Sequence, residues 1–255
     1  MAKVIVRTLA DLLDSNTLPS GVSFELKPDT IDTGLKVAEA KDSQLWREKL
    51  MQVLAVTESI GGKNVKEAGG VSFLGSMLDT DIVFLSLAWT AVVNGSALTL
   101  PSPIPCPECT APFTSVDLGL LEVVCYDGQV QGADAYVLVE FDSKFRTRFP
   151  ESLREGEIVI IPPTWLSARS RVPANSVQSQ VSVDMYRAMT SLGIRKGTEQ
   201  PRGISLAEVR TLPMAALQTV ISTMSEHVPS FKRIVKFHCN ACNTDIDVPF
   251  GTEDT

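Results

Sequence analysis

The stretches "PSPIPCPECTAPFTSVDL" (residues 101–118) and "VKFHCNACNTDIDVPF" (residues 235–250) each contain one CxxC motif, and 129 residues separate the two motifs. In a CxxC turn the two thiolates converge on one ion, so two such turns supply the four soft ligands of a tetrahedral zinc. The alternative is two separate reducible pairs. We expect one structural zinc ion with four ligands: Cys106, Cys109, Cys239 and Cys242.

The residues that follow each motif predict a strand. Polar and apolar residues alternate over 114–118 after the first motif and over 246–250 after the second. Two cysteine turns, each leading into its own strand, form a zinc ribbon. The sequence therefore predicts a ribbon whose two halves lie far apart along the chain.

The remaining cysteine and the two histidines are expected to take no part in the metal site. Cys125 ends the apolar run "LLEVVCY", which predicts a buried, inert thiol. His238 precedes Cys239 and could replace it as a ligand, whereas His227 is expected to end a helix. Because four thiolates already complete a tetrahedral site, both histidines are predicted to be bystanders.

The distance between the motifs defines the expected domain organisation. Lengthening a closed loop costs only about 0.6 kcal/mol per doubling, whereas structural zinc contributes on the order of 10 kcal/mol or more. A shared ion can therefore close a long insertion. We expect an α+β protein in three parts: an N-terminal strand and helices (1–100), the split zinc ribbon (101–118 plus 232–250) and an inserted module, β-rich and then helical (119–231).

The N-terminal part reads as one strand followed by helices. "GVSFELKP" (21–28) alternates like a strand. Residues 42–62 predict a helix with Trp46 on its apolar face and a glycine pair as its C-terminal stop. The run 82–93 is apolar nearly all round, which predicts a helix buried between other elements.

The inserted module changes from sheet to helix along the chain. Four runs are strand-like: "LLEVVCY" (120–126), "AYVLVEF" (135–141), "KFRTRF" (144–149) and "GEIVIIPP" (156–163). In the third, three basic residues alternate with other side chains, which favours a solvated strand face over an anion or nucleic-acid site. Helices are then expected at 180–193, after a Ser205/Glu208 capping box and at 214–224, with the polar stretch "IRKGTEQPRG" as a loop.

Composition and charge narrow the functional classes. The chain has 255 residues, 44% of them hydrophobic and 21% charged, which is an ordinary globular composition. A net charge of −7 and a pI near 5.0 give no overall attraction to nucleic acid or anionic lipid. The start of the chain lacks the pattern of a secretory signal, and 82–93 is too short to span a bilayer. We expect a soluble protein of a reducing cytoplasm, with no membrane partner.

Enzymatic activity is not expected. The sequence has no GxSxG, no HExxH and no glycine-rich phosphate loop followed by lysine. Four thiolates leave no open coordination position for zinc hydrolysis. Asp79 and Asp81 are expected to be helix-surface or N-terminal charges rather than a catalytic pair.

The order of features along the chain resembles the tail baseplate protein family of contractile-tailed bacteriophages, the small baseplate hub and hub-assembly proteins. The resemblance is carried by "LPSGVSFELKP", "LDTDIVFLSLAWTAVVNG", the cysteine turn leading into "VDLGLLEV", the sheet-rich middle and the final "FHCNACNTDIDVPF". It implies a protein–protein role at the centre of a phage-like tail, with the four cysteines as metal ligands and no catalytic residues. The segment 175–203 departs from the family pattern and is assigned no role.

We therefore expect a non-enzymatic structural or assembly component of a contractile tail baseplate or a related injection device. Its expected partners are other tail or baseplate proteins, with several copies in a symmetric assembly. Its expected location is the virion or, during assembly, the host cytoplasm. The alternative is a zinc-ribbon nucleic-acid-binding protein, which the acidic charge does not favour.

Overall fold

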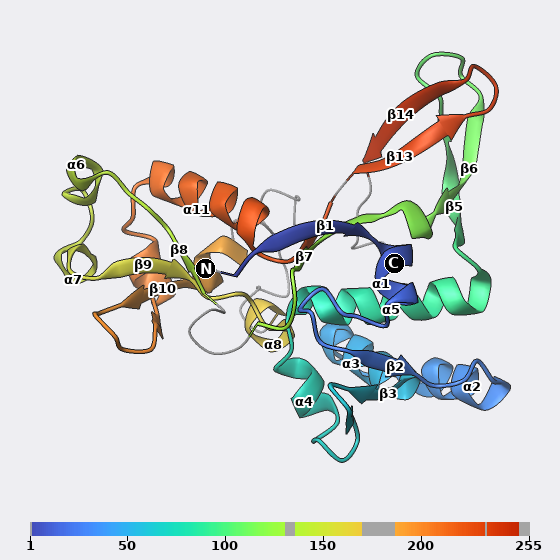
Figure 1. Ribbon diagram of the computed structural model, residues 1–255, viewed down its shortest axis with the longest axis horizontal. Coiled ribbons are helices and arrows are strands. Elements are labelled where there is room, and N and C mark those ends of the chain that lie inside the picture. Colours follow the sequence, from blue (N-terminus) through green and yellow to red (C-terminus); the bar gives the residue numbers. More distant parts are fainter. Residues whose placement is uncertain (1, 131–135, 170–186, 233, 250–255) are drawn as a thin grey trace.

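The computed structural model describes residues 2–130, 136–169, 187–232 and 234–249. Within these residues the chain forms small antiparallel sheets interspersed with helices around two hydrophobic clusters (Figure 1). The mixed α and β content agrees with the expected class.

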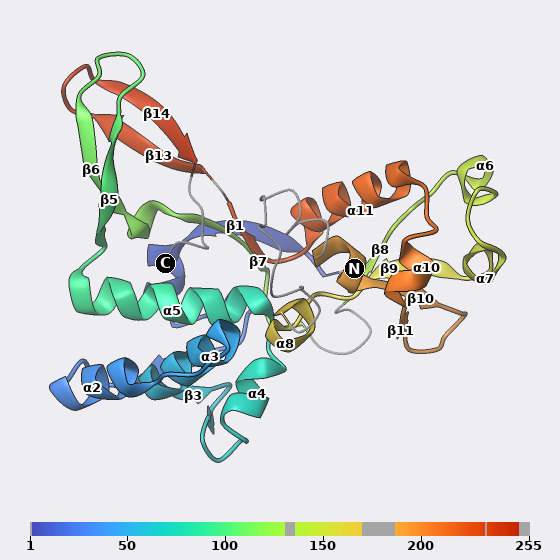
Figure 2. The same ribbon diagram turned by 180° about the vertical axis from the view of Figure 1, so that it is seen from behind.

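The first hydrophobic cluster is built mainly from the N-terminal elements. α5 lies between the layer of α2 and α3 on one side and β1 on the other (Figures 1 and 2), and buries Ile82, Phe84 and Leu85. The elements are β1 (Val4–Thr8), α1 (Leu9–Asp14), β2 (Phe24–Leu26), α2 (Ile31–Glu39), α3 (Leu45–Val56), β3 (Thr57–Ile60), β4 (Lys63–Asn64), α4 (Val71–Gly75) and α5 (Asp79–Asn94).

Two hairpins project from this body as an arm (Figure 1). Each is a two-stranded antiparallel sheet, and the first continues into a short 3-10 turn. The elements are β5 (Ala97–Pro105), β6 (Pro112–Asp117), η1 (Leu118–Leu120), β13 (Ile234–Cys239) and β14 (Thr244–Pro249).

The second hydrophobic cluster lies at the opposite end of the molecule (Figure 1). A four-stranded sheet of order β11–β10–β9–β8 packs there with α11 and the short helices. The elements from β7 onward are β7 (Glu122–Tyr126), β8 (Val137–Leu138), α6 (Ser143–Arg146), α7 (Glu151–Arg154), β9 (Glu157–Ile160), α8 (Trp165–Arg169), a helical stretch at 187–191, β10 (Leu192–Arg195), β11 (Arg202–Gly203), α10 (Leu206–Val209), α11 (Met214–His227) and β12 (Ser230–Phe231).

A three-stranded sheet of order β1–β7–β12 joins segments from the start, the middle and the end of the chain. Val4 pairs with Tyr126, and Ser230 pairs with Val124 on the other side of β7. Residues expected in the N-terminal part and in the insertion thus share one sheet. The boundaries 1–100 and 119–231 stay a prediction, but the metal site is not the only tie between these parts.

The predicted strand at 144–149 is wrong. Asp142 caps a helical turn by accepting a hydrogen bond from the backbone N–H of Lys144, and α6 follows. Phe141, Phe145 and Phe149 recur at every fourth residue, a helical spacing, and their ring centroids lie 5.0–5.9 Å apart. The aromatic cluster decides the local structure, and the expected basic strand face does not form.

The predicted helix at 42–62 ends earlier than expected. α3 stops at Val56, and the next four residues form β3. Gly61 and Gly62, expected to stop the helix, instead form the two-residue turn between β3 and β4, with φ of 59° and 72°. Two successive positive φ angles are what a tight hairpin turn requires, and glycine adopts them without strain.

Other expectations are met in part. Val92 and Val93, in the last turn of α5, are about half exposed, so the helix is not buried all round. The expected loop "IRKGTEQPRG" contains the paired ends of β10 and β11. The Ser205/Glu208 capping box is confirmed. The first half of the predicted helix at 180–193 lies outside the described residues; 187–191 are helical, and the last two residues begin β10.

Candidate metal centre

The four predicted ligands meet at the end of the projecting arm. The first two lie in the turn between β5 and β6, and the other two lie at the end of β13 and in the turn before β14. All four sulfur atoms lie within 4.8 Å of one another. The structure thus brings together the whole predicted set: Cys106, Cys109, Cys239 and Cys242.

The sulfur spacing fits one central ion. The Sγ atoms of Cys106 and Cys242 are 3.8 Å apart, and those of Cys109 and Cys239 are 3.6 Å apart. A tetrahedron with metal–sulfur bonds of about 2.3 Å has edges of about 3.8 Å. A disulfide needs about 2.05 Å, and all four cysteines are free thiols. The short contacts link different motifs, so the two CxxC turns form one site.

The two cysteine turns have the same backbone geometry. The N–H of Thr110 donates to the carbonyl of Cys106 at 2.9 Å, and the N–H of Asn243 donates to that of Cys239 at 2.7 Å. Thr110 and Asn243 both have positive φ, 61° and 58°. Asn tolerates this conformation, whereas a β-branched Thr adopts it at a cost. The strained Thr110 indicates that the turn is held by its surroundings.

Apolar residues from both hairpins belong to the same hydrophobic cluster as the four cysteines. Phe113 and Phe237 lie with ring centroids 5.3 Å apart, and Ile246, across the sheet from Phe237, is buried. Cys106 and Cys239 are themselves 1–2% exposed. The two hairpins therefore pack against each other through side chains as well as through their thiols.

The thiol cluster disfavours negative charge unless a cation is bound. The backbone N–H of Ala111 lowers the pKa of Cys109, but burial and hydrogen bonds among the thiols together raise it to about 12. A bound divalent cation reverses this balance because it stabilises thiolates directly. Metal binding at this site should therefore release protons.

The histidines stay outside this cluster, as predicted. Both ring nitrogens of His238 face oxygen atoms, with Nδ1 2.8 Å from Asp245 Oδ1 and Nε2 3.1 Å from Asn243 Oδ1. The hydrogen bond to Asp245 is the main reason that the pKa of His238 is raised. His227 ends α11, and its ring lies 3.9 Å from Glu226.

Cys125 is buried in β7, as expected. Its Sγ lies 3.5 Å from the carbonyl oxygen of Ile5 on the neighbouring strand. Burial raises the pKa of this thiol. It is therefore a poor nucleophile at neutral pH.

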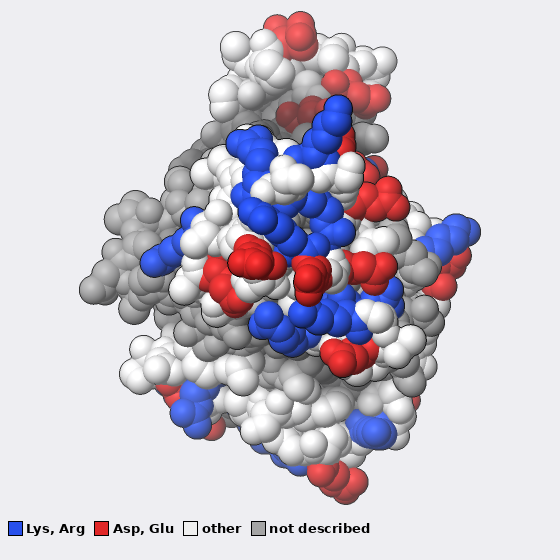
Figure 3. All heavy atoms as spheres, turned by 90° about the vertical axis from the view of Figure 1, so that its left-hand side faces the viewer, with Lys and Arg blue, Asp and Glu red and all other residues white. Residues whose placement is uncertain are grey.

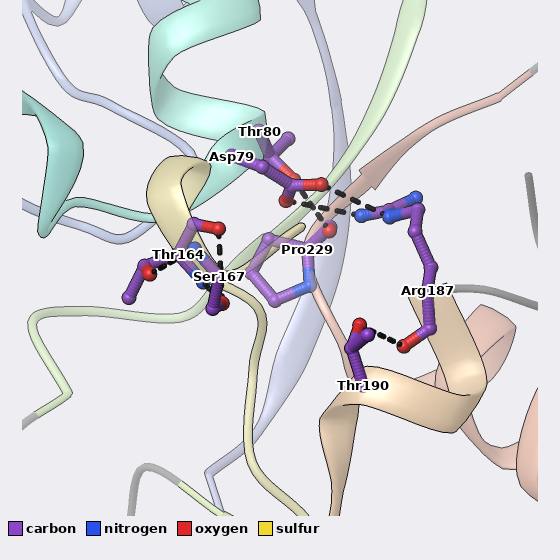
Figure 4. A network of polar contacts seen from close by, with 7 residues as sticks. All are labelled: Asp79, Thr80, Thr164, Ser167, Arg187, Thr190 and Pro229. Carbon is purple, nitrogen blue, oxygen red and sulfur yellow. Dashed lines mark hydrogen bonds and ion pairs between the residues drawn. The ribbon is translucent and has the colours of Figure 1, made fainter. Parts of the chain in front are cut away.

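Sequence reasoning missed a second polar site, at the start of α5. Asp79 is buried and forms a two-point ion pair with Arg187, whose Nε lies 2.9 Å from Oδ2 and whose Nη2 lies 3.1 Å from Oδ1 (Figure 4). Thr80 donates a hydrogen bond of 2.7 Å to the carbonyl of Pro229. The first turn of α5 is thereby joined to residues next to the second cluster.

Asp81 is also buried, so the expectation of helix-surface charges is wrong for both carboxylates, although both do lie in the first turn of a helix. One oxygen of Asp81 accepts the backbone N–H of Ser20 at 3.0 Å. Burial raises the pKa of Asp81 to about 7, against the opposing effect of the bonds from Ser20. We call the contacts of Asp79, Thr80 and Asp81 the joint at the start of α5. In the sequence, the only sign of this joint is that the two aspartates directly precede an apolar run.

Comparison of the chain with protein-family models, with curated proteins and with solved structures gives no match. Over the described ranges, every helix falls short of the length and apolarity needed to cross a membrane. The functional argument therefore rests on the cysteine cluster and on the sequence.

Proposed function

We propose that this protein is a non-enzymatic structural or assembly component of a contractile tail baseplate or a related injection device, stabilised by one structural zinc ion. The observation that supports it is the closed set of four converging thiols. Four thiolates saturate a tetrahedral ion and leave no position for a water or a substrate. Such a site stabilises a fold, and the resemblance to baseplate hub proteins supplies the assembly role.

Zinc is the ion that this ligand set favours. Thiolates exclude magnesium and calcium, and a tetrahedral four-sulfur site takes zinc or iron. When the protein is purified from cells grown in medium that contains both zinc and iron, elemental analysis should find close to one zinc per chain. Iron would instead give a coloured protein, and protein that folds without any metal would contradict the assignment.

The alternative of a nucleic-acid-binding ribbon has little electrostatic support. The arm sequences 97–118 and 234–249 contain one lysine and four carboxylates, and four thiolates with one divalent ion add about two further negative charges. Lysine and arginine gather instead at the far end of the molecule, where acidic side chains lie among them (Figure 3). Salt-sensitive retardation of single- or double-stranded DNA in a gel would revive this alternative.

The assembly role is tested in the source cell by affinity capture of the zinc-loaded protein, with quantitative mass spectrometry of the captured proteins and of purified tail particles. A fixed ratio to tail proteins in particles supports a permanent component. Enrichment of tail proteins in the capture alone supports an assembly factor. Finding neither would refute the proposal, and a Cys242→Ser variant serves as the control for dependence on the metal site.

A further inference from the structure

A groove of about 460 Å³ lies beside the C-terminal half of α11, away from the cysteine cluster. The sheet contributes one wall through β7 and β12, the helix contributes the other, and the start of β13 closes one end. The apolar lining consists of Val124, Ile221, Met224, Val228, Pro229, Phe231 and Ile234. Apolar grooves of this size commonly accept side chains of a ligand or partner.

An edge strand runs along this groove. β12 is the last strand in the order β1–β7–β12, so within the described part of the chain one of its edges pairs with no strand. Both residues of β12, Ser230 and Phe231, line the groove. A free edge beside an apolar groove suits an extended segment, which can add main-chain hydrogen bonds at the edge and place alternate side chains in the groove.

The charged side chains that the structure describes along the groove are basic. Among the described lining residues, Arg187 and Lys232 carry a charge and none is a carboxylate. The pair with Asp79 engages Nε and Nη2 of Arg187, and a guanidinium has further donors on Nη1. Lys232 lies 3.3 Å from Glu122 in a partly exposed pair, which another acid can share. The donors that these two pairs leave over suit an acidic ligand.

We propose that this groove binds an extended segment of a partner protein in which apolar and acidic residues alternate. The apolar side chains enter the groove between α11 and β12. The acidic side chains face Lys232, whose side chain is 46% exposed, and the outer part of the mostly buried Arg187 guanidinium. This interface is separate from the metal site and requires no particular ion there.

Two labelled eight-residue peptides test the charge preference on the full, zinc-loaded chain. One alternates valine with glutamate and the other alternates valine with lysine. Fluorescence anisotropy at low salt should show saturable binding of the glutamate peptide and binding at least about tenfold weaker for the lysine peptide. Equal affinity for both peptides, or no saturation by the glutamate peptide up to about 1 mM, would overturn the proposal.

A matched pair of isoleucine variants locates the binding. Ile234 lines the groove and is 49% exposed, so Ile234→Asp should leave the fold intact. It should lower the affinity for the glutamate peptide at least about tenfold. Ile31, on α2, is 85% exposed and outside the groove, so Ile31→Asp should leave the affinity unchanged. Unchanged binding by Ile234→Asp, or loss of binding by Ile31→Asp alone, would place the peptide elsewhere and refute the assignment.

Discussion

The cysteine cluster and the joint at the start of α5 both connect segments more than 100 residues apart, yet they do so by different chemistry. Cys106 and Cys242 are 136 residues apart and meet at one prospective ion, whereas Asp79 and Arg187 are 108 residues apart and meet as a buried ion pair. The metal site uses four equivalent ligands on an exposed arm. The joint uses unlike groups in the interior, where charge is costly.

This difference shows which long-range contacts a sequence reveals. A metal site repeats one residue type at a fixed local spacing, so each half predicts the other. An ion pair leaves no such repetition. The contribution of an ion pair to stability also depends on how deeply the pair is buried, and burial is determined by the fold as a whole.

The largest expected effect comes from breaking the metal site. Cys109→Ser and Cys242→Ser should each abolish zinc binding and remove a contribution on the order of 10 kcal/mol. Because both hairpins share the ion, hydrogen exchange should increase at β6 and at β14 in either variant. Cys125→Ser is the matched control and should keep close to one zinc per chain. Loss of protection confined to the mutated hairpin would show two independent sites.

The next effect is a pH dependence at the joint. The pKa of Asp81 is about 7 in the folded chain and about 3.9 when unfolded, so the folded state binds more protons between these values. The contribution of Asp81 to the free energy of unfolding should therefore fall as pH rises from about 4 to 7 and stay low above that, by about 4 kcal/mol at most, and comparison with a variant at the same pH separates it from the pH dependence of the metal site. Asp81→Asn should remove this fall in the free energy of unfolding, because asparagine does not ionise.

Urea unfolding at pH 4 and pH 8 measures this effect. The Asn variant should match the wild type at pH 4 and exceed it at pH 8. Asp14→Asn, at an exposed position, is the control and should follow the wild type at both. Equal stability of Asp81→Asn and wild type at pH 8 would mean that Asp81 carries no burial cost.

A smaller loss is expected from breaking the ion pair of the joint. Asp79→Ala leaves the guanidinium of Arg187 without its partner in a mostly buried place, which should cost about 3 kcal/mol in the free energy of unfolding. A double-mutant cycle with Arg187→Ala should show that the two losses are not additive. Additive losses in denaturant unfolding would argue against a direct coupling.

The smallest effect is expected at His238. Its ring contacts Asp245 and Asn243 at the surface rather than the sulfur cluster. His238→Ala should therefore keep the zinc content and shift the melting temperature little. A fall in zinc per chain, measured by elemental analysis, would show that His238 takes part in the site.

The cysteine cluster and several helices could be predicted because their signals are local. Two CxxC motifs with similar flanks specify one geometry, and the Ser205/Glu208 capping box fixes a helix start within four residues. α11 was equally visible from its apolar face, where Leu217, Val220 and Met224 are buried.

The errors arose where two local patterns competed. Alternation of basic residues at 144–149 suggested a strand, but the aromatic spacing of four residues and the Asp142 cap favour a helix. A glycine pair can stop a helix or form a hairpin turn. Here β3 pairs with β4, so the two glycines form the turn. The burial of Asp79 and Thr80 could not be derived from local sequence, because their partners, Arg187 for Asp79 and Pro229 for Thr80, come from elsewhere in the chain.

The β1–β7–β12 sheet has a consequence for synthesis on the ribosome. Val4 cannot pair until Tyr126 has emerged, and β7 gains its second neighbour only when Ser230 appears. At about 5–20 residues per second, β1 stays without its partner for roughly 6–25 s and the sheet stays incomplete for roughly 11–45 s. During that interval β1 exposes an unpaired, partly apolar edge to other nascent chains. Productive folding of this protein is thus a matter of timing as well as stability, and slower translation should lower its yield more than that of a protein with local strand pairs.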